Sequence, residues 1–548
     1  MYLAEMNRTR TRGVALAVFA SAIVLAVLVA GPGLPLLSIA DDPTRDRPAD
    51  PSTEGTVGYV DGYWYDDELS VDGSDDATVS EDELEAVVSR SMARVETIRG
   101  LTFEEDVSVD VISREEYQSQ NDTSIEDPTA DQRLQSNLRL EALFMADRET
   151  SAVEEQQSFY DGSVAGYYDP ETDEIVIVSE DPDDPALDEL TLGHELVHAL
   201  QDQHYNLTSY ERETQDQANA KNGLIEGDAV WVENRYETRC SQDWACTVPS
   251  TNPQGDQTEP NWGLYLTIFH PYDDGPDYVD AVLGEGDSRD WDALNSAYDD
   301  PPASSSEVIR PGEEREPRDV DVEDRSSENW TQHEVDGAVA NDSLGEATMV
   351  SMFAADGLAG EESVIEPDEL LPDGPTGTIE NIDYDHEVTD GWAGDELVTY
   401  VGDDESIDES GYVWETEWES TTEAEQFLEG YLELLSLHGA EDIDGHRDTF
   451  SIEDEDGYPG AYYLEHDGER VTIVRGPSVE AVDEIDAGSA PEGEDTLELD
   501  ATAPDSGAGD EAGPDGSSAN DGEPISGFGS AVAVVALLVA ALTARLSR

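Results

Sequence analysis

The stretch Gly193-His-Glu-Leu-Val-His-Ala-Leu-Gln-Asp-Gln-His204 contains two histidines four residues apart, His194 and His198. The surrounding residues 188–203 include no proline and have the composition of a helix. Residues four apart on an α-helix lie one turn above the other, rotated by only about 40°. The two imidazoles can therefore bind a single Zn²⁺, and Glu195 would lie beside the open coordination position of that ion.

The spacing His-Glu-x-x-His is that of zinc metallopeptidases, in which the glutamate takes a proton from water. The same pattern also occurs in helices that bind no metal, and the alternative here is an amphipathic helix whose histidines pair with nearby carboxylates. The upstream sequence favours the metal site. Residues 165–170 predict a turn and residues 175–178 (Ile-Val-Ile-Val) a strand. Such enzymes hold an extended substrate along the edge of a strand in this position.

A zinc site of this type needs a third protein ligand, and the sequence offers two candidates. His204 follows His198 by six residues, as in metzincins, but Gln201 replaces the glycine at which the metzincin chain folds back. On a continuing helix, His204 would point about 120° away from His198. Glu226 lies in an apolar part of a second predicted helix, residues 217–237. A glutamate from a following helix completes a His₂Glu ligand set, and we therefore favour Glu226.

The segments around these ligands resemble predicted gluzincin-type zinc metallopeptidases, whose signature is HELxHALQDQHF followed by LxEGDA. Here the two runs are His-Glu-Leu-Val-His-Ala-Leu-Gln-Asp-Gln-His-Tyr at 194–205 and Leu-Ile-Glu-Gly-Asp-Ala at 224–229. Further matching segments lie on both sides, at residues 107–117, 271–275, 291–302, 304–308, 391–395 and 414–418. The resemblance implies an α+β fold with a gluzincin-like core: a strand or hairpin, the HExxH helix and the following glutamate helix. It implies zinc and a hydrolase fold more firmly than any substrate.

One departure from the family concerns a possible catalytic residue. The family often has His-Pro after its Pro-Pro-Ser-Thr segment, whereas this chain has Arg310-Pro311. In the expected mechanism, Glu195 accepts a proton from water and delivers it to the leaving amine, while zinc and one protein donor stabilise the oxyanion. Asp228 could accept a hydrogen bond from a ligand imidazole. The candidate oxyanion donors are Tyr167, Tyr168, Tyr236, Tyr272 and Arg310.

The chain is strongly acidic, with 131 acidic and 26 basic residues and a formal net charge of −105. Such an excess is typical either of a disordered chain or of a folded halophilic protein. Disorder is excluded for most of the sequence, because 37% of the residues are hydrophobic and they recur throughout. Multimolar salt, with a Debye length of about 3 Å, would screen the self-repulsion. We therefore predict a protein of an extreme halophile, of haloarchaeal type, and exclude nucleic acid as a partner.

The N-terminal residues predict export. Arg8, Arg10 and Arg12 precede an apolar run at 13–30, and Ser38-Ile-Ala40 is a small-residue cleavage site. This order is typical of a secretory signal peptide. The alternative is an uncleaved N-terminal anchor, because the apolar run has nearly the length needed to span a membrane.

The C-terminal residues predict attachment to the cell surface. Residues 487–524 are rich in acidic residues, Gly, Ser and Pro, and predict a disordered stalk. Ser526-Gly-Phe-Gly529, the apolar run 530–542 and the arginines Arg545 and Arg548 resemble the PGF-CTERM signal of archaeal surface proteins, with Ser526 in place of its proline. That resemblance implies removal by a sortase-like membrane enzyme and a lipid anchor. Unprocessed, the segment would form about 25 Å of helix, just enough to span.

Two further features agree with an exterior location. Cys240 and Cys246 are the only cysteines and predict one small disulfide rather than a zinc site. Glycosylation sequons occur at Asn121, Asn206, Asn329 and Asn341.

The expected organisation has seven segments. They are a signal peptide or anchor (1–40), an acidic linker (41–55), a metallopeptidase-like core (56–311), a second acidic linker (312–329), a C-terminal α+β domain (330–486), the stalk (487–524) and the membrane or sorting segment (525–548). Within the core, a capping box at 80–83 predicts a helix to Arg99. Residues 107–112 predict a strand. In the C-terminal domain we expect a helix at 422–437 and strands at 397–401, 412–418, 461–464 and 471–474.

The leading hypothesis is a cell-surface zinc metallopeptidase that cleaves peptides or unfolded proteins and is tethered to the outer face of the membrane at its C-terminus. The first alternative is a non-catalytic surface or envelope protein with the same fold. A substrate-binding lipoprotein is a third hypothesis, but the chain has no lipid-attachment cysteine after the predicted signal.

Overall fold

The computed structural model describes residues 19–20, 47–74, 77–124, 128–170, 172–179, 181–182, 184–249, 260–284, 289–313, 315–372, 381–453 and 457–499. The expected signal peptide, apart from residues 19–20, lies outside these residues, as do residues 500–524 of the expected stalk and the whole C-terminal sorting segment. The first part of that stalk, residues 487–499, is packed and not disordered: the backbone NH groups of Thr496 and Leu497 donate to Oδ1 of Asp448, and Ala490 is buried. None of the helices within the described residues combines the length and the apolar character needed to cross a membrane.

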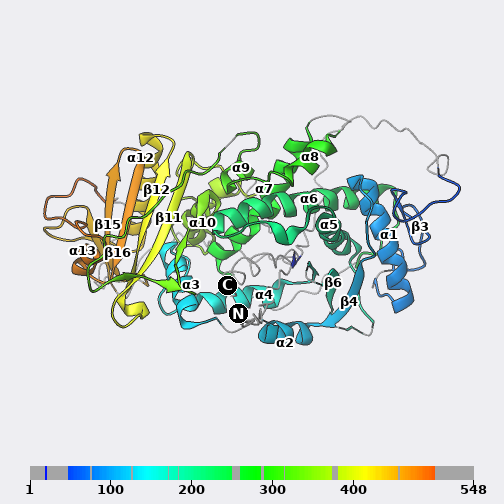
Figure 1. The fold of residues 1–548 in the computed structure, drawn as a ribbon, viewed down its shortest axis with the longest axis horizontal. Helices are drawn as coiled ribbons and strands as arrows, with labels where there is room; N and C mark the ends of the chain where they lie inside the picture. Colours follow the sequence, from blue (N-terminus) through cyan, green and yellow to red (C-terminus); the bar gives the residue numbers. More distant parts are fainter. Residues whose placement is uncertain are drawn as a thin grey trace, which may run out of the picture.

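The protein has an α+β fold in which a central group of helices lies between two sheets (Figure 1). At one end, α1 (Glu81–Arg99) begins with the predicted capping box, in which the Ser80 and Glu83 side chains each accept a hydrogen bond from the backbone NH of the other residue. The short hairpin β2 (Tyr59–Val60) and β3 (Tyr63–Trp64) packs beside it.

The smaller sheet supports the HExxH helix. Its order is β1-β5-β6-β4, in which β4 (Ser108–Ser113) is parallel to β6 (Glu174–Ser179) and β5 (Gly166–Asp169) is antiparallel to it. The short strand β1 (Phe19–Ala20) pairs antiparallel with β5. The prediction of a turn at 165–170 is therefore wrong for most of its length. Tyr167 and Tyr168 pair with β6 as part of strand β5, which ends at Asp169. The turn to β6 follows this strand and includes Asp173, whose φ is 58°.

Three long helices form the centre of the molecule. They are α5 (Glu189–Tyr205), α6 (Gln215–Gln242) and α7 (Trp262–Leu283). The first two confirm the helices predicted from the sequence, although α6 is longer at both ends. α5 is capped by Asp188, whose side chain accepts a hydrogen bond from the Leu190 NH, and α6 by Thr214. The shorter helices around them are α2 (Arg114–Ser124), α3 (Ala130–Ala142), α4 (Ala152–Ser163), α8 (Trp291–Ala297), α9 (Ser305–Ile309), α10 (Gly345–Leu358) and α11 (Pro367–Leu370).

The larger, antiparallel sheet lies at the other end, with strand order β10-β11-β12-β16-β15-β14-β13 and β7 (Thr331–Gln332) also paired with β11. Its long strands β11 (Trp392–Val401), β12 (Ser410–Trp418), β15 (Gly460–Asp467) and β16 (Arg470–Gly476) include the four strands predicted for the C-terminal unit. The shorter ones are β10 (Asn341–Asp342), β13 (Glu441–Asp442) and β14 (Thr449–Ile452). The helices α12 (Thr421–Leu437) and α13 (Val479–Ile485) pack against it.

The expected division at 312–330 is not a boundary in the packing. Residues 312–329 form no helix or strand where they are described, yet the Arg318 NH donates to the carbonyl of Ala393 at 2.6 Å and Val322 is buried. One hydrophobic cluster also continues from α7 through α10 to the larger sheet. The acidic run contains enough apolar and basic residues to hold it against β11, so it packs as an extended strap rather than as a free linker.

Candidate metal centre

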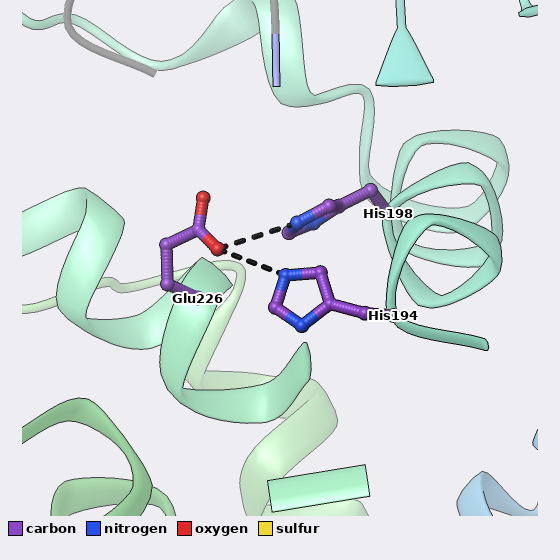
Figure 2. A group of neighbouring side chains, drawn as sticks. All are labelled: His194, His198 and Glu226. Carbon is purple, nitrogen blue, oxygen red and sulfur yellow. Dashed lines mark hydrogen bonds and ion pairs between the residues drawn. The ribbon is translucent and has the colours of Figure 1, made fainter. Parts of the chain in front are cut away.

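Three predicted zinc ligands converge between α5 and α6 (Figure 2). His194 and His198 project from α5, and Glu226 from α6. The Nε2 atom of each histidine lies 3.3 Å from Oε2 of Glu226. One ligand atom from each residue lies within 4.8 Å of the others, and all three side chains are buried. No other group of three or more His, Cys, Asp or Glu residues in the described part of the chain has this geometry.

The spacing of these atoms fits a tetrahedral ion. Zinc bonds of about 2.0–2.1 Å to nitrogen and oxygen place neighbouring ligand atoms about 3.3 Å apart. The two distances between a histidine nitrogen and the carboxylate oxygen have this value. In addition, Oε1 of Glu226 is buried without a hydrogen-bond partner, and the carboxylate of Glu195 is also buried. Buried acceptors in this condition are costly unless a cation or a water satisfies them.

Hydrogen bonds on the far side of each imidazole fix its orientation. Nδ1 of His194 lies 2.9 Å from Oε2 of Glu233, and Nδ1 of His198 lies 2.9 Å from Oε1 of Gln201. Both partners are acceptors, because the Gln201 amide nitrogen is already a donor to the Ile225 carbonyl. Each Nδ1 therefore donates to its partner, and each Nε2 is the ring nitrogen that faces the ligand cluster.

Asp228 contacts Gln201 and not, as the sequence had predicted, a ligand imidazole. Its Oδ2 accepts a hydrogen bond from the amide nitrogen of Gln201 at 3.4 Å, and not from an imidazole. Stronger bonds hold that carboxylate: Arg99 Nε donates at 2.9 Å and the Tyr298 hydroxyl at 2.7 Å. Asp228 thus acts on His198 through Gln201 and connects α1 to the site.

The position of Glu226 depends on a close crossing of α6 and α7. A Cβ atom added to Gly227 would lie 2.3 Å from the carbonyl oxygen of Gly275, and one added to Gly275 would lie 2.5 Å from that of Gly223. The two backbones approach so closely only because these residues have no side chain. The crossing brings Tyr272 of α7 next to Glu226 of α6.

Tyr272 is the candidate oxyanion donor that lies at the centre. Its ring stacks on that of His194 with 6.4 Å between ring centroids and 14° between planes. Burial raises the pKa of the Tyr272 hydroxyl well above its usual range, and the carboxylates of Glu226 and Glu195 and a hydrogen bond to Glu226 raise it further. The hydroxyl therefore keeps its proton and can donate a hydrogen bond.

The ionisable groups of the centre are strongly coupled. Burial alone would lower the pKa of His194, but its hydrogen bonds to Glu226 and Glu233 raise it to about 10. Burial would raise the pKa of Glu226, but the two histidines lower it to about 2. Burial raises the pKa of Glu195 well above its usual range, the charge of His194 opposes this, and Glu226 adds to it. The buried Glu226 carboxylate therefore stays ionised beside the two imidazoles, as a metal ligand must.

The remaining candidates lie away from the centre. The Tyr168 hydroxyl contacts Asp202 at 3.0 Å, and only the backbone of this residue acts on Glu195, through a hydrogen bond that lowers the pKa of that carboxyl. The Tyr167 ring packs on Tyr117 from the other face of β5. Arg310 pairs with Glu346 and Asp385. His204 forms a hydrogen bond with the Thr102 carbonyl and is no ligand, which agrees with its expected direction on the helix.

Three of the four predicted glycosylation sites can be located in the structure. The side chains of Asn206 and Asn329 are exposed, and that of Asn341 is half-buried. The side chain of Asn121 is not among the described ones.

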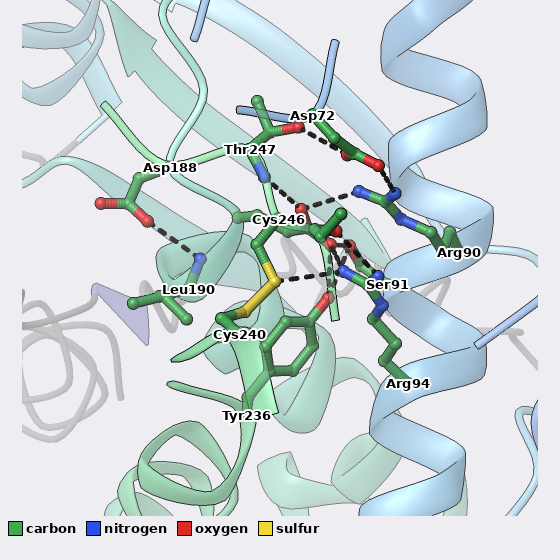
Figure 3. Close-up of a disulfide and its surroundings, with 12 residues drawn as sticks. Asp72, Arg90, Ser91, Arg94, Asp188, Leu190, Tyr236, Cys240, Cys246 and Thr247 are labelled. Carbon is green, nitrogen blue, oxygen red and sulfur yellow. Dashed lines mark hydrogen bonds and ion pairs between the residues drawn. A yellow bond between two sulfur atoms is a disulfide. The ribbon is translucent and has the colours of Figure 1, made fainter. Parts of the chain in front are cut away.

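Cys240 and Cys246 form a disulfide beside the first turn of α5 (Figure 3). The loop that follows it binds Glu189, the first residue of that helix: the Thr247 NH donates to Oε2 at 2.8 Å. The other oxygen of Glu189 accepts from Arg94 and from the hydroxyl of Tyr236 at 2.6 Å. Tyr236 is therefore occupied in holding the start of α5 and does not reach the ligands.

Comparisons with known proteins concern the C-terminal part only. Residues 332–486 match the model of a domain of unknown function, DUF8575. That range nearly coincides with the C-terminal unit expected from the sequence. Searches of curated proteins and of solved structures found no match.

Proposed function

We propose that this chain is a zinc-dependent metallopeptidase of gluzincin type, which hydrolyses peptides or unfolded proteins outside the cell. The observation that carries the proposal is the convergence of two imidazole nitrogens on one buried carboxylate oxygen at 3.3 Å each, with the buried Glu195 directly after His194 on the same helix. A buried pair of carboxylates and two buried histidines, each oriented by a hydrogen bond at Nδ1, have little structural use without a metal.

A zinc ion bound by His194, His198 and Glu226 would act as a Lewis acid that polarises a peptide carbonyl and lowers the pKa of a coordinated water. Glu195 would take the proton of the attacking water and return it to the leaving amine, which needs a carboxylate of raised pKa. The Tyr272 hydroxyl would donate a hydrogen bond to the developing oxyanion. Glu233 and Gln201 would keep the imidazoles aligned during the reaction.

The strand β5 is suited to hold the substrate. It is next to α5, its four residues are buried, and its side away from β6 pairs with an extended segment of two residues, β1. An extended peptide could use the same backbone groups. We further propose that the enzyme acts on the outer face of the membrane. This proposal rests on the predicted signal and sorting segments and on the Cys240–Cys246 disulfide, which suits an oxidising exterior.

The test is hydrolysis of an unfolded protein by the purified chain in multimolar KCl, with zinc content measured in the same samples. Glu195→Gln should abolish hydrolysis and retain zinc, because this glutamate is no ligand. Glu425→Gln, an exposed position on α12, is the matched control and should behave as wild type. A zinc-loaded, folded wild type without activity would favour a non-catalytic surface protein. Folded protein that binds no zinc would refute the metal site itself.

A further inference from the structure

The Cys240–Cys246 disulfide closes a short segment that returns from the end of α6 to the start of α5 (Figure 3). Cys240 lies in the last turn of α6, and Cys246 follows it by six residues. The next residue, Thr247, pairs with Glu189, the first residue of α5, in both directions. The Glu189 NH donates to the Thr247 carbonyl at 2.9 Å, and the Thr247 NH donates to the Glu189 carboxylate at 2.8 Å. The disulfide therefore connects the two helices that carry the candidate metal ligands.

One arginine of α1 bonds both the closed segment and the start of α5. Arg94 Nη1 donates to the Glu189 carboxylate, and Nη2 donates to the Ala245 carbonyl at 3.0 Å. Nη1 also lies 3.4 Å from Sγ of Cys246, and the guanidinium lies over the Trp244 ring, 4.8 Å from Cζ to the centroid. Because the same side chain holds both partners, a displacement of the segment would also disturb the contacts of Glu189.

The Glu189 carboxylate depends on these contacts because it is an enclosed charge. Loss of one donor to a buried carboxylate leaves part of that charge unsatisfied. Glu189 precedes His194 by five residues, about one and a half helical turns, so a loosened first turn of α5 would shift His194 relative to Glu226 and Glu233. The donors to the Glu189 carboxylate are Arg90, Ser91, Arg94, Tyr236 and Thr247.

The bond itself is within reach of small thiols. Both cysteines are half-buried, whereas Glu189 and Thr247 are enclosed. Closing a loop of this length removes chain entropy from the open state and favours the closed segment by roughly 50-fold. Opening the bond would release this constraint without touching any candidate metal ligand.

We propose that the Cys240–Cys246 bond is a redox switch of the metal centre, in which the oxidised form binds zinc tightly and the reduced form weakly. Formation of the bond breaks two S–H bonds and makes one S–S bond, while a disulfide oxidant takes up both electrons and both protons and becomes two thiols. Arg94 would stabilise the Cys246 thiolate that this exchange requires. The inference rests on the proposed zinc site and adds its regulation: the site fills after the chain leaves a reducing compartment.

Hydrogen exchange of the full-length, zinc-free chain in multimolar KCl tests the switch independently of hydrolysis. Exchange is followed by mass spectrometry in the oxidised chain, after reduction with a phosphine, and after reoxidation with oxidised glutathione. The amides of Glu189 and Thr247 report directly, since each donates in the pair described above. The amides of α12, in the C-terminal unit, are the internal control.

Zinc affinity is measured in parallel by competition with a chelator of known affinity. The double variant Cys240→Ser/Cys246→Ser represents the open state, because it cannot form the bond and offers no thiol to zinc. The same variant treated with the phosphine controls for effects of the reductant itself.

We expect reduction to speed exchange at Glu189 and Thr247 by about 10- to 50-fold, with α12 unchanged and full recovery after reoxidation. The double variant should bind zinc about 10- to 50-fold more weakly than the oxidised wild type.

Three results would overturn the inference. They are unchanged exchange at the start of α5 after reduction, wild-type zinc affinity in the double variant, and loss of protection throughout the chain, which would make the bond a support of the whole fold. Oxidised wild type that binds no zinc would refute the metal site and this inference with it. Zinc binding without hydrolysis would refute the peptidase alone and leave the switch in place.

Discussion

Substitution of Gly227 by alanine should disturb the metal centre through backbone packing alone. The added Cβ would lie 2.3 Å from the Gly275 carbonyl oxygen, 2.4 Å from its carbon and 2.8 Å from its Cα. Backbone atoms cannot rotate away, so α6 and α7 must separate by about 1 Å to restore van der Waals contact. Overpacking of this kind costs about 1–3 kcal/mol, whereas alanine in place of glycine in a helix gains about 1 kcal/mol. The net loss in the free energy of unfolding should therefore be up to about 2 kcal/mol.

The effect on zinc should be larger than the effect on stability suggests. Glu226 directly precedes Gly227, and metal sites tolerate ligand displacements of only about 0.2 Å. We expect zinc affinity to fall by about 10- to 100-fold. Competition with a chelator of known affinity measures the zinc dissociation constant, and urea denaturation in multimolar KCl measures stability. Asn234→Ala, on the exposed face of α6, gains helix propensity without a clash and is the control.

Two results would refute this reasoning. Wild-type zinc affinity in Gly227→Ala would mean that the helix crossing does not position Glu226. A variant more stable than wild type, by as much as Asn234→Ala, would mean that the close contact between Gly227 and Gly275 does not exist in solution.

Three further predictions concern single side chains. Glu233→Ala removes the acceptor for Nδ1 of His194 and should weaken zinc binding by about 10-fold or more, measured by the same chelator competition, since orienting partners typically contribute this much. Tyr272→Phe should lower kcat by about 10- to 1000-fold with zinc content unchanged; an equal loss of zinc would instead make the hydroxyl a support for Glu226. Asp216 is buried, which raises its pKa to about 7 from an unfolded value near 3.8. The folded chain therefore holds that proton more tightly, and its stabilising effect is lost as pH rises from about 4 through 7. Asp216→Asn should increase the free energy of unfolding by up to about 4 kcal/mol at pH 8 and change it little at pH 4, as measured by urea denaturation.

The convergence of the three candidate ligands could be predicted from the sequence because local helix geometry decides most of it. The spacing of His194 and His198 on one helix fixes their relative position, and the same argument excluded His204, which the structure places against Thr102. The apolar surroundings of Glu226 indicated a buried carboxylate. The α+β class and the two ligand helices followed from periodicity in the same way.

The partners of the ligands could not be found in this way, because they depend on how α5 and α6 are placed against each other. Glu233 lies seven residues after Glu226, two turns along the same face, and that spacing was the only available signal. Asp228 was expected to contact an imidazole, but Gln201 lies between them.

The charges that hold the candidate metal centre in place should respond to salt differently from the charges at the protein surface. A net charge of −105 should make the fold dependent on salt, because exposed carboxylates repel one another unless they are screened. The contacts that position the ligands are of another kind. Glu189 is held at the start of α5 by Arg90 and Arg94, and Asp228 by Arg99, in pairs that are almost completely buried. Salt screens such pairs far less than exposed ones. All three arginines come from α1, so the N-terminal helix holds both the beginning of the HExxH helix and the network behind His198. The metal centre should therefore stay intact as salt is withdrawn, until α1 separates with the rest of the fold.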